Sequence, residues 1–152
     1  MKDKPDVDAV HDAIGQLQRL ADLFRVRRGQ LASGAGLSEQ QWQVLEQIGA
    51  NDGFLPSLFA RSRERSAPAV SRVLRQLQDK GLVTASVGDT DARHRKYALT
   101  ARGRRVLDTL GASRREAIDA VWMDLDPKAL AAFTRFSHEL ARRLEALAAR
   151  QP

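Results

Sequence analysis

The stretch SAPAVSRVLRQLQDKGLV, residues 66–83, decides the fold of this chain. Apolar side chains recur in it at every third or fourth position, which predicts a helix with one buried face. Gly81 is suited to end that helix, because glycine adopts the left-handed backbone conformation at little cost. The buried face is predicted to consist of Val70, Val73, Leu74 and Leu77.

The start of this helix is rich in small residues. Proline fits the first turn of a helix, where its missing N–H would have no helical partner. The N-cap is either Ser66 or Ala67, because a proline disfavours helical angles at the residue before it. Small side chains at a helix N-terminus allow its N–H groups and positive dipole end to approach a phosphate. The candidates for this contact are Ser66, Ala67, Pro68 and Ala69.

Three polar side chains of this helix lie off the apolar face: Ser71, Arg72 and Arg75. Serine and arginine are suited to phosphate contacts, and arginine can also bind guanine through two hydrogen bonds. The alternative is a solvated surface helix in which Arg75 pairs with Asp79, four residues later.

The residues after this helix predict a β-hairpin. LVTASV, residues 82–87, is β-branched and roughly alternating, and KYALT, residues 96–100, is a short returning strand. GDTDARHR, residues 88–95, lies between them as a charged turn, so the hairpin has a basic tip.

Three helices are predicted before residue 66. Residues 7–31 carry a long apolar stripe that Gly29 and then Ser33–Gly36 interrupt. Ser38 and Gln41 form a capping-box pattern at the start of a second helix, which ends near Gly49. The third is short, from Pro56 to about Arg63, and buries Leu58 and Phe59.

Two more helices are predicted after the hairpin. Thr100 caps the first, which carries apolar residues as far as Trp122. Asp126 followed by proline predicts the start of the last helix, which runs to about residue 149.

Positive charge is concentrated in the middle of the chain. The whole sequence has a net charge of +6, whereas residues 61–105 hold twelve basic and four acidic residues, a net charge of +8. Such a segment is typical of a protein that binds a polyanion, although a merely basic surface remains an alternative.

Two short helices followed by a two-stranded hairpin form a winged helix-turn-helix arrangement, in which the second helix is suited to the DNA major groove. The sequence resembles the MarR family of bacterial transcriptional regulators. The resemblance is carried by LSEQQWQVLEQI at 37–48, by residues 66–83, and by DARHRKYALTARGRRVL at 91–107.

The resemblance adds residues to the candidate DNA-binding site. Asp91 and Arg93 match the D-x-R pattern of the family's wing, in which the acid orients an arginine inserted into the minor groove. Arg95 and Lys96 extend this basic edge, and an ordinary charged turn is the alternative. The chain departs from the family at Arg63 and Arg65, where aliphatic residues are usual, and these two arginines are candidates for phosphate contacts.

The predicted fold is mainly α, in the α+β class. It is a single MarR-like domain over residues 1–152, with a winged helix-turn-helix region at 37–107. Apolar stripes on the outer helices, at 5–32 and 108–150, predict a two-fold dimer, and the alternative is that these helices fold back on their own domain. The resemblance implies the same dimer, which presents two recognition helices to a palindromic site.

The predicted function is a sequence-specific DNA-binding transcriptional regulator acting as a homodimer on double-stranded DNA, a repressor with an activator as the alternative. The resemblance implies a small aromatic or anionic effector bound between the dimerisation helices and the winged domain. Phe24, Trp42 and Trp122 are candidate lining residues for this pocket, with plain core packing as the alternative. The alternative function is a basic helical adaptor that binds an acidic protein, or nucleic acid without sequence preference.

The sequence predicts no enzymatic activity, no metal site and no cofactor. It has no nucleophile-elbow, phosphate-loop or zinc-protease motif, and its histidines, at 11, 94 and 138, lie on separate elements. The first ten residues have no apolar signal region, no apolar run is long enough to span a membrane, and cysteine is absent. A cytoplasmic protein without a membrane partner is therefore expected.

Overall fold

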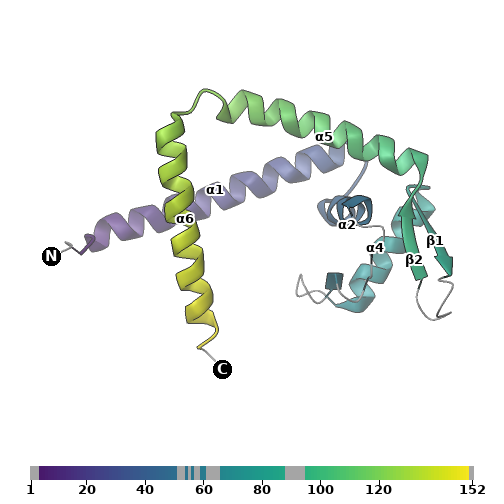
Figure 1. The fold of residues 1–152 in the computed structure, drawn as a ribbon, viewed down its shortest axis with the longest axis horizontal. Coiled ribbons are helices and arrows are strands. Elements are labelled where there is room, and N and C mark those ends of the chain that lie inside the picture. The colour runs from purple at the N-terminus through teal and green to yellow at the C-terminus, as the bar shows by residue number, and fades with distance from the viewer. Residues whose placement is uncertain are drawn as a thin grey trace. The chain divides into compact units, whose positions relative to one another are not determined.

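A computed structural model describes residues 4–50, 54, 56, 59–60, 66–87 and 95–150. They form two compact units, Met1–Ser113 and Arg114–Pro152, and the boundary between the units lies within helix α5 (Figure 1). No helix in these ranges is long and apolar enough to cross a membrane. In chain order the elements are α1 (Val7–Gly34), α2 (Glu39–Ala50), α4 (Ala67–Asp79), β1 (Val83–Val87), β2 (Arg95–Leu99), α5 (Ala101–Trp122) and α6 (Pro127–Ala148).

This order confirms the predicted fold class: the chain is mainly helical, with one antiparallel pair of strands. Of the short helix predicted from Pro56, the described residues 56, 59 and 60 are helical, whereas Leu58 lies outside the described ranges. The prediction that Gly29 interrupts α1 is wrong, because the helix continues to Gly34. Glycine weakens a helix by about 1 kcal/mol, but it ends one only where the chain turns to positive φ, as it does at Gly36.

The C-terminus of α4 has the glycine cap that the sequence predicted. Gly81 has a φ of 68°, and Leu82 donates its N–H to the carbonyl oxygen of Leu77 at 3.0 Å. This is the Schellman arrangement, and the buried side chains of Leu77 and Leu82 add its usual hydrophobic contact. Gly36, with a φ of 71°, ends α1 in the same way. These caps set the direction of the chain into α2 and into the hairpin.

The N-terminus of α4 resolves the two alternatives for its cap. Ser66 is the N-cap, with extended backbone angles, and its Oγ accepts a hydrogen bond from the N–H of Ala69 at 3.3 Å. Pro68 is the second residue of the helix, where an N–H would have no acceptor within the helix, so its absence costs no hydrogen bond.

Replacing Ser66 with alanine is expected to lower the free energy of unfolding by about 1 kcal/mol, since the Ala69 N–H loses its capping partner. Ser66→Asp keeps an acceptor at the same place and serves as the control. Urea denaturation of the two variants measures the difference. Equal stabilities for the two variants would contradict the capping role.

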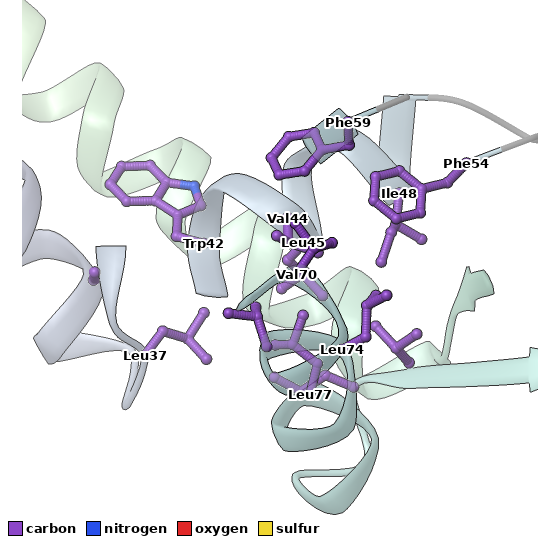
Figure 2. Packing of buried hydrophobic residues seen from close by; sticks show 14 of the residues in the cluster. Leu37, Trp42, Val44, Leu45, Ile48, Phe54, Phe59, Val70, Leu74 and Leu77 are labelled. Atoms are coloured by element: carbon purple, nitrogen blue, oxygen red, sulfur yellow. The ribbon is translucent and has the colours of Figure 1, made fainter. Parts of the chain in front are cut away.

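One apolar core lies in the first unit, where α2 packs against α4 and the hairpin (Figures 1 and 2). Figure 2 shows Trp42 and Leu37 at one end of the cluster and Phe54 and Phe59 at the other. The predicted buried face of α4 is confirmed. The buried apolar residues are Ala32, Leu37, Trp42, Val44, Leu45, Ile48, Phe54, Phe59, Ala60, Val70, Val73, Leu74, Leu77, Leu82, Val83 and Leu110.

The hairpin is held to this core by aromatic side chains. Strands β1 and β2 pair in register from Val83 opposite Leu99 to Val87 opposite Arg95. Tyr97 on β2 forms an isolated bridge with Phe54, and their rings meet edge to face with centroids 6.4 Å apart. The wing therefore has a fixed base beside α2 and α4.

The start of α5 is locked to the base of the hairpin. Thr100 donates its N–H to the Leu82 carbonyl oxygen at 3.0 Å and its hydroxyl hydrogen to the Gly81 carbonyl oxygen at 2.7 Å. The same hydroxyl accepts the N–H of Gly103 at 3.0 Å, which confirms Thr100 as the cap of this helix. A Cβ on Gly103 would lie 2.1 Å from the Leu82 carbonyl oxygen, so the helix can pack here only because residue 103 is glycine.

Helix α1 leaves most of its apolar stripe uncovered within the first unit. Ala32, near the C-terminal end, is its one buried residue. The exposed large apolar side chains of α1 are Val7, Val10, Ile14, Leu20, Leu23, Phe24 and Val26.

Helix α6, in the second unit, begins at the predicted cap and has an uncovered apolar stripe of its own. The Asp126 carboxylate accepts the N–H groups of Lys128 and Ala129, and none of the helix residues is buried. On its polar side, a hydrogen bond from Arg143 and a second, smaller contribution from the hydrogen bond of Arg142 lower the pKa of the Glu139 carboxyl. The exposed apolar side chains of α6 are Leu130, Phe133, Phe136, Leu144 and Leu147.

Candidate nucleic-acid interface

The solvent face of α4 presents two arginines. Arg72 and Arg75 are exposed, and neither forms an ion pair with any residue in the described ranges. The alternative that Arg75 is held by Asp79 is therefore not supported. Ser71 is exposed between Arg72 and the buried Val70, so the polar residues predicted to face DNA are all accessible.

The N-terminus of α4 is open to an approaching phosphate, but it offers few donors. Ala67 and Pro68 are exposed and Ala69 is half-buried. Proline has no N–H, and the Ala69 N–H is already bonded to Ser66. Within the described ranges, the Ala67 N–H is thus the donor of this turn that no hydrogen bond engages, and it adds to the positive end of the helix dipole.

Three contacts hold α4 in place. Its apolar face packs on α2, the Gln41 Nε2 donates to the Gln76 Oε1 at 2.9 Å, and the Lys80 Nζ donates to the Gly36 carbonyl oxygen at 2.5 Å. Sequence reasoning missed both polar contacts, because their partners lie 35 and 44 residues apart. A helix held along its apolar face and at its C-terminal end can present its arginines in one orientation.

The wing adds two basic side chains next to its tip. Arg95 and Lys96 are exposed at the start of β2. Because successive strand residues point to opposite faces of the sheet, Arg95 shares the face of Tyr97 and Lys96 lies on the other face. The predicted residues Arg63, Arg65, Asp91 and Arg93 lie outside the described ranges, and their roles stay predictions.

Positive charge dominates this surface. In residues 66–87 and 95–100 the structure describes five basic side chains and one acidic side chain. Low negative charge beside two guanidinium groups that pair with no acid in the described ranges favours a polyanionic partner over a neutral one. The basic residues are Arg72, Arg75, Lys80, Arg95 and Lys96, and the acidic one is Asp79.

The three aromatic residues predicted to line an effector pocket differ in their surroundings. Trp42 is 6% exposed and belongs to the core of the first unit, which agrees with the alternative of plain core packing. Its buried Nε1 nevertheless has no hydrogen-bond partner in the described part of the chain. Phe24 is 46% exposed on α1. Trp122 is half-buried in the second unit. No group of three metal-binding side chains occurs among the described residues.

Comparison with known families shows what this chain is similar to. The sequence model of the MarR family matches residues 35–94, which include α2, α4 and β1. Over these residues the chain is similar to the MarR family. The predicted resemblance to the MarR family is therefore confirmed. No curated protein sequence matches the chain significantly.

Solved structures of other proteins share the fold. A MarR family transcription regulator superposes with a TM-score of 0.86 at 20% identity, covering 94% of this chain and 95% of the other. MepR of Staphylococcus aureus in complex with DNA gives a TM-score of 0.70 at 19% identity, covering 87% and 94%. CouR of Rhodococcus jostii bound to p-coumaroyl-CoA gives 0.69 at 20% identity, covering 86% and 93%. At these identities the similarity shows that the fold is common to all of them.

Proposed function

We propose that this chain is a MarR-family regulator that binds DNA sequence-specifically and acts as a homodimer on a palindromic site. The observation that carries the proposal is the pair of exposed arginines, Arg72 and Arg75, on a helix held by two polar contacts outside its apolar face. Helices of this kind enter the DNA major groove, and arginine is the side chain that most often reads guanine there.

The remaining basic groups are suited to position the protein rather than to read sequence. Lys96 and Arg95 lie at the wing, and the exposed Ala67 N–H lies at the helix start, where phosphate oxygens are the natural acceptors. The predicted wing arginine, Arg93, adds a minor-groove contact to this proposal. The protein then acts by binding, without catalysis, in the cytoplasm where its DNA target lies.

The dimer is proposed from the uncovered apolar faces. The stripe of α1 in the first unit and that of α6 in the second unit each expose large aliphatic and aromatic side chains. Exposed apolar area of this extent marks an interaction surface. A second copy of the chain would cover it symmetrically and place two recognition helices about 34 Å apart, one turn of DNA.

Repression is the simplest outcome of such binding, because a dimer seated on a promoter occupies the DNA that polymerase needs. We propose in addition that a small aromatic or anionic effector releases the dimer. The structure of CouR holds p-coumaroyl-CoA, and the buried Trp42 Nε1 is a donor that such a ligand would satisfy. Adding aromatic carboxylates to a protein–DNA complex and measuring release tests this part separately.

Selection of bound sites from random duplex DNA tests the main proposal. The expected result is a palindrome that binds at least about 10³-fold more tightly than random DNA. Equal affinity for all duplexes would contradict sequence-specific regulation and would favour the basic adaptor.

Replacing Arg72 with alanine is expected to weaken binding to the selected site by about 1–3 kcal/mol, or roughly fivefold to 150-fold, without lowering thermal stability. Fluorescence anisotropy at several salt concentrations measures this loss. A phosphate contact lowers the slope of log affinity against log salt by about one, whereas a base contact relaxes the sequence preference. Arg19→Ala, which removes an exposed arginine of α1, is the matched control. Wild-type affinity in the Arg72 variant would remove Arg72 from the interface.

A further inference from the structure

Gln41 is the one buried polar residue among the described residues, with an exposed fraction of 7%. Both ends of its side-chain amide are bonded. Its Oε1 accepts the N–H of Ser38 at 3.1 Å, and its Nε2 donates to the Oε1 of Gln76 at 2.9 Å. The Ser38 Oγ in turn accepts the Gln41 N–H at 3.1 Å, which completes a capping box at the start of α2.

Chemistry dictates the direction of this hydrogen-bond chain. A backbone N–H can only donate, so the end of the Gln41 amide that faces Ser38 must be the carbonyl oxygen. The other end is an NH₂ group, which can only donate, so Gln76 must turn its own carbonyl oxygen toward Gln41. The planar amide of Gln76 then directs its NH₂ group away from α2.

Gln76 lies beside a candidate DNA-binding residue. It is exposed on α4, one helical turn after Arg72, so the two side chains are neighbours on the helix surface. A glutamine with both ends free binds adenine through a donor and an acceptor together. Gln76 offers its NH₂ donors to solvent while its acceptor is engaged by Gln41.

We infer that Gln76 is a specificity-determining residue, and that Gln41 is the positioning residue that sets its polarity. Gln76 favours guanine in the major groove, because guanine presents two acceptors there, O6 and N7, whereas thymine presents one, O4. This inference rests on the proposed function, since it assigns one base position in each half of the palindromic site.

Site selection from random duplex DNA with the full-length protein tests the inference, with Gln41→Glu as the decisive variant. Glutamate at this position still completes the capping box, so the helix start is preserved. Its second oxygen faces Gln76 and can only accept, so the Gln76 amide turns over and presents its carbonyl oxygen to the groove. The preference at one position of each half-site is expected to change from guanine to a base with an amino group, cytosine or adenine, by about fivefold.

Two controls separate this effect from a change of charge or of fold. Gln40→Glu adds the same charge to the neighbouring exposed residue of α2, and it is expected to leave the selected site unchanged. Gln76→Ala is expected to lose the preference at the same single position and at no other. Thermal unfolding of each variant reports whether it folds. Should Gln41→Glu not fold, Gln41→Met takes its place: it frees the Gln76 amide, so adenine becomes acceptable at that position.

The outcomes distinguish this inference from the proposed function. A site for folded Gln41→Glu that equals the wild-type site at every position would overturn the role of Gln41. A Gln76→Ala site identical to that of the wild type would overturn the role of Gln76. In both cases the wild-type protein still selects a palindrome, so the proposed function stands. A wild-type protein that selects no sequence would overturn the proposed function, and the inference with it.

Discussion

Replacing Gly103 with alanine is expected to lower the free energy of unfolding by about 3 kcal/mol or more. The added Cβ would lie 2.1 Å from the carbonyl oxygen of Leu82, which is backbone and cannot rotate away. That oxygen also accepts the Thr100 N–H. Relief of the clash must therefore move the start of α5 off the base of the hairpin.

The loss has two physical sources. Overpacking of a close contact costs about 1–3 kcal/mol, and each hydrogen bond lost at Thr100 adds about 1 kcal/mol. For a chain of this size, 3 kcal/mol corresponds to a decrease in Tm of about 6–12 °C. Calorimetry or circular dichroism during heating measures the decrease.

Gly15→Ala is the matched control for this variant. Gly15 lies inside α1, and a Cβ there would meet nothing within 4 Å. Alanine is the better helix former by about 1 kcal/mol, so the same substitution is expected to stabilise the protein at residue 15. A destabilisation at 103 no larger than the effect at 15 would contradict the role assigned to Gly103.

Replacing Phe133 with aspartate is expected to raise the dissociation constant of the proposed dimer by about 100-fold or more. Loss of a buried aromatic side chain from an interface costs about 2 kcal/mol or more, and an unpaired carboxylate in an apolar interface adds a desolvation cost. Two-fold symmetry places the change twice in each dimer. A dissociated protomer presents one recognition helix instead of two, so affinity for the palindrome falls as well.

Sedimentation equilibrium measures the effect on assembly. Phe133 is 44% exposed in the single chain, so the substitution is expected to leave the helix content of the protomer unchanged. Ala131→Asp introduces the same charge at an exposed site of α6 on the side away from the apolar stripe, and this control is expected to remain dimeric. A wild-type chain that sediments as a monomer, or a Phe133→Asp dimer of wild-type affinity, would contradict the role of α6.

Local patterns predicted most of the secondary structure. The face of α4 followed from the spacing of Val70, Val73, Leu74 and Leu77, and the end of that helix followed from Gly81. These features depend on residues within one or two helical turns, which is the range over which sequence periodicity and capping act. The predicted helix break at Gly29 was wrong, because glycine permits a helix to end without requiring it.

Part of the candidate site was predictable from the same local periodicity. Arg72 and Arg75 are exposed because the opposite side of α4 is apolar, and that alternation is visible in the sequence. The absence of an ion pair between Arg75 and Asp79 in the described structure was not visible there, since spacing allows such a pair without requiring it. The contributions of Arg63, Arg65, Asp91 and Arg93 remain predictions.

By itself, the sequence determined where most of the helices lie, which side of α4 is apolar, and that the middle of the chain carries the positive charge. Only the tertiary structure decided that Gln41 bonds Gln76, that Lys80 bonds Gly36, and that residue 103 must be glycine. The physical reason is distance along the chain. Helical period and capping are local, whereas these contacts join residues 21 to 44 positions apart and exist only when the core has brought their helices together.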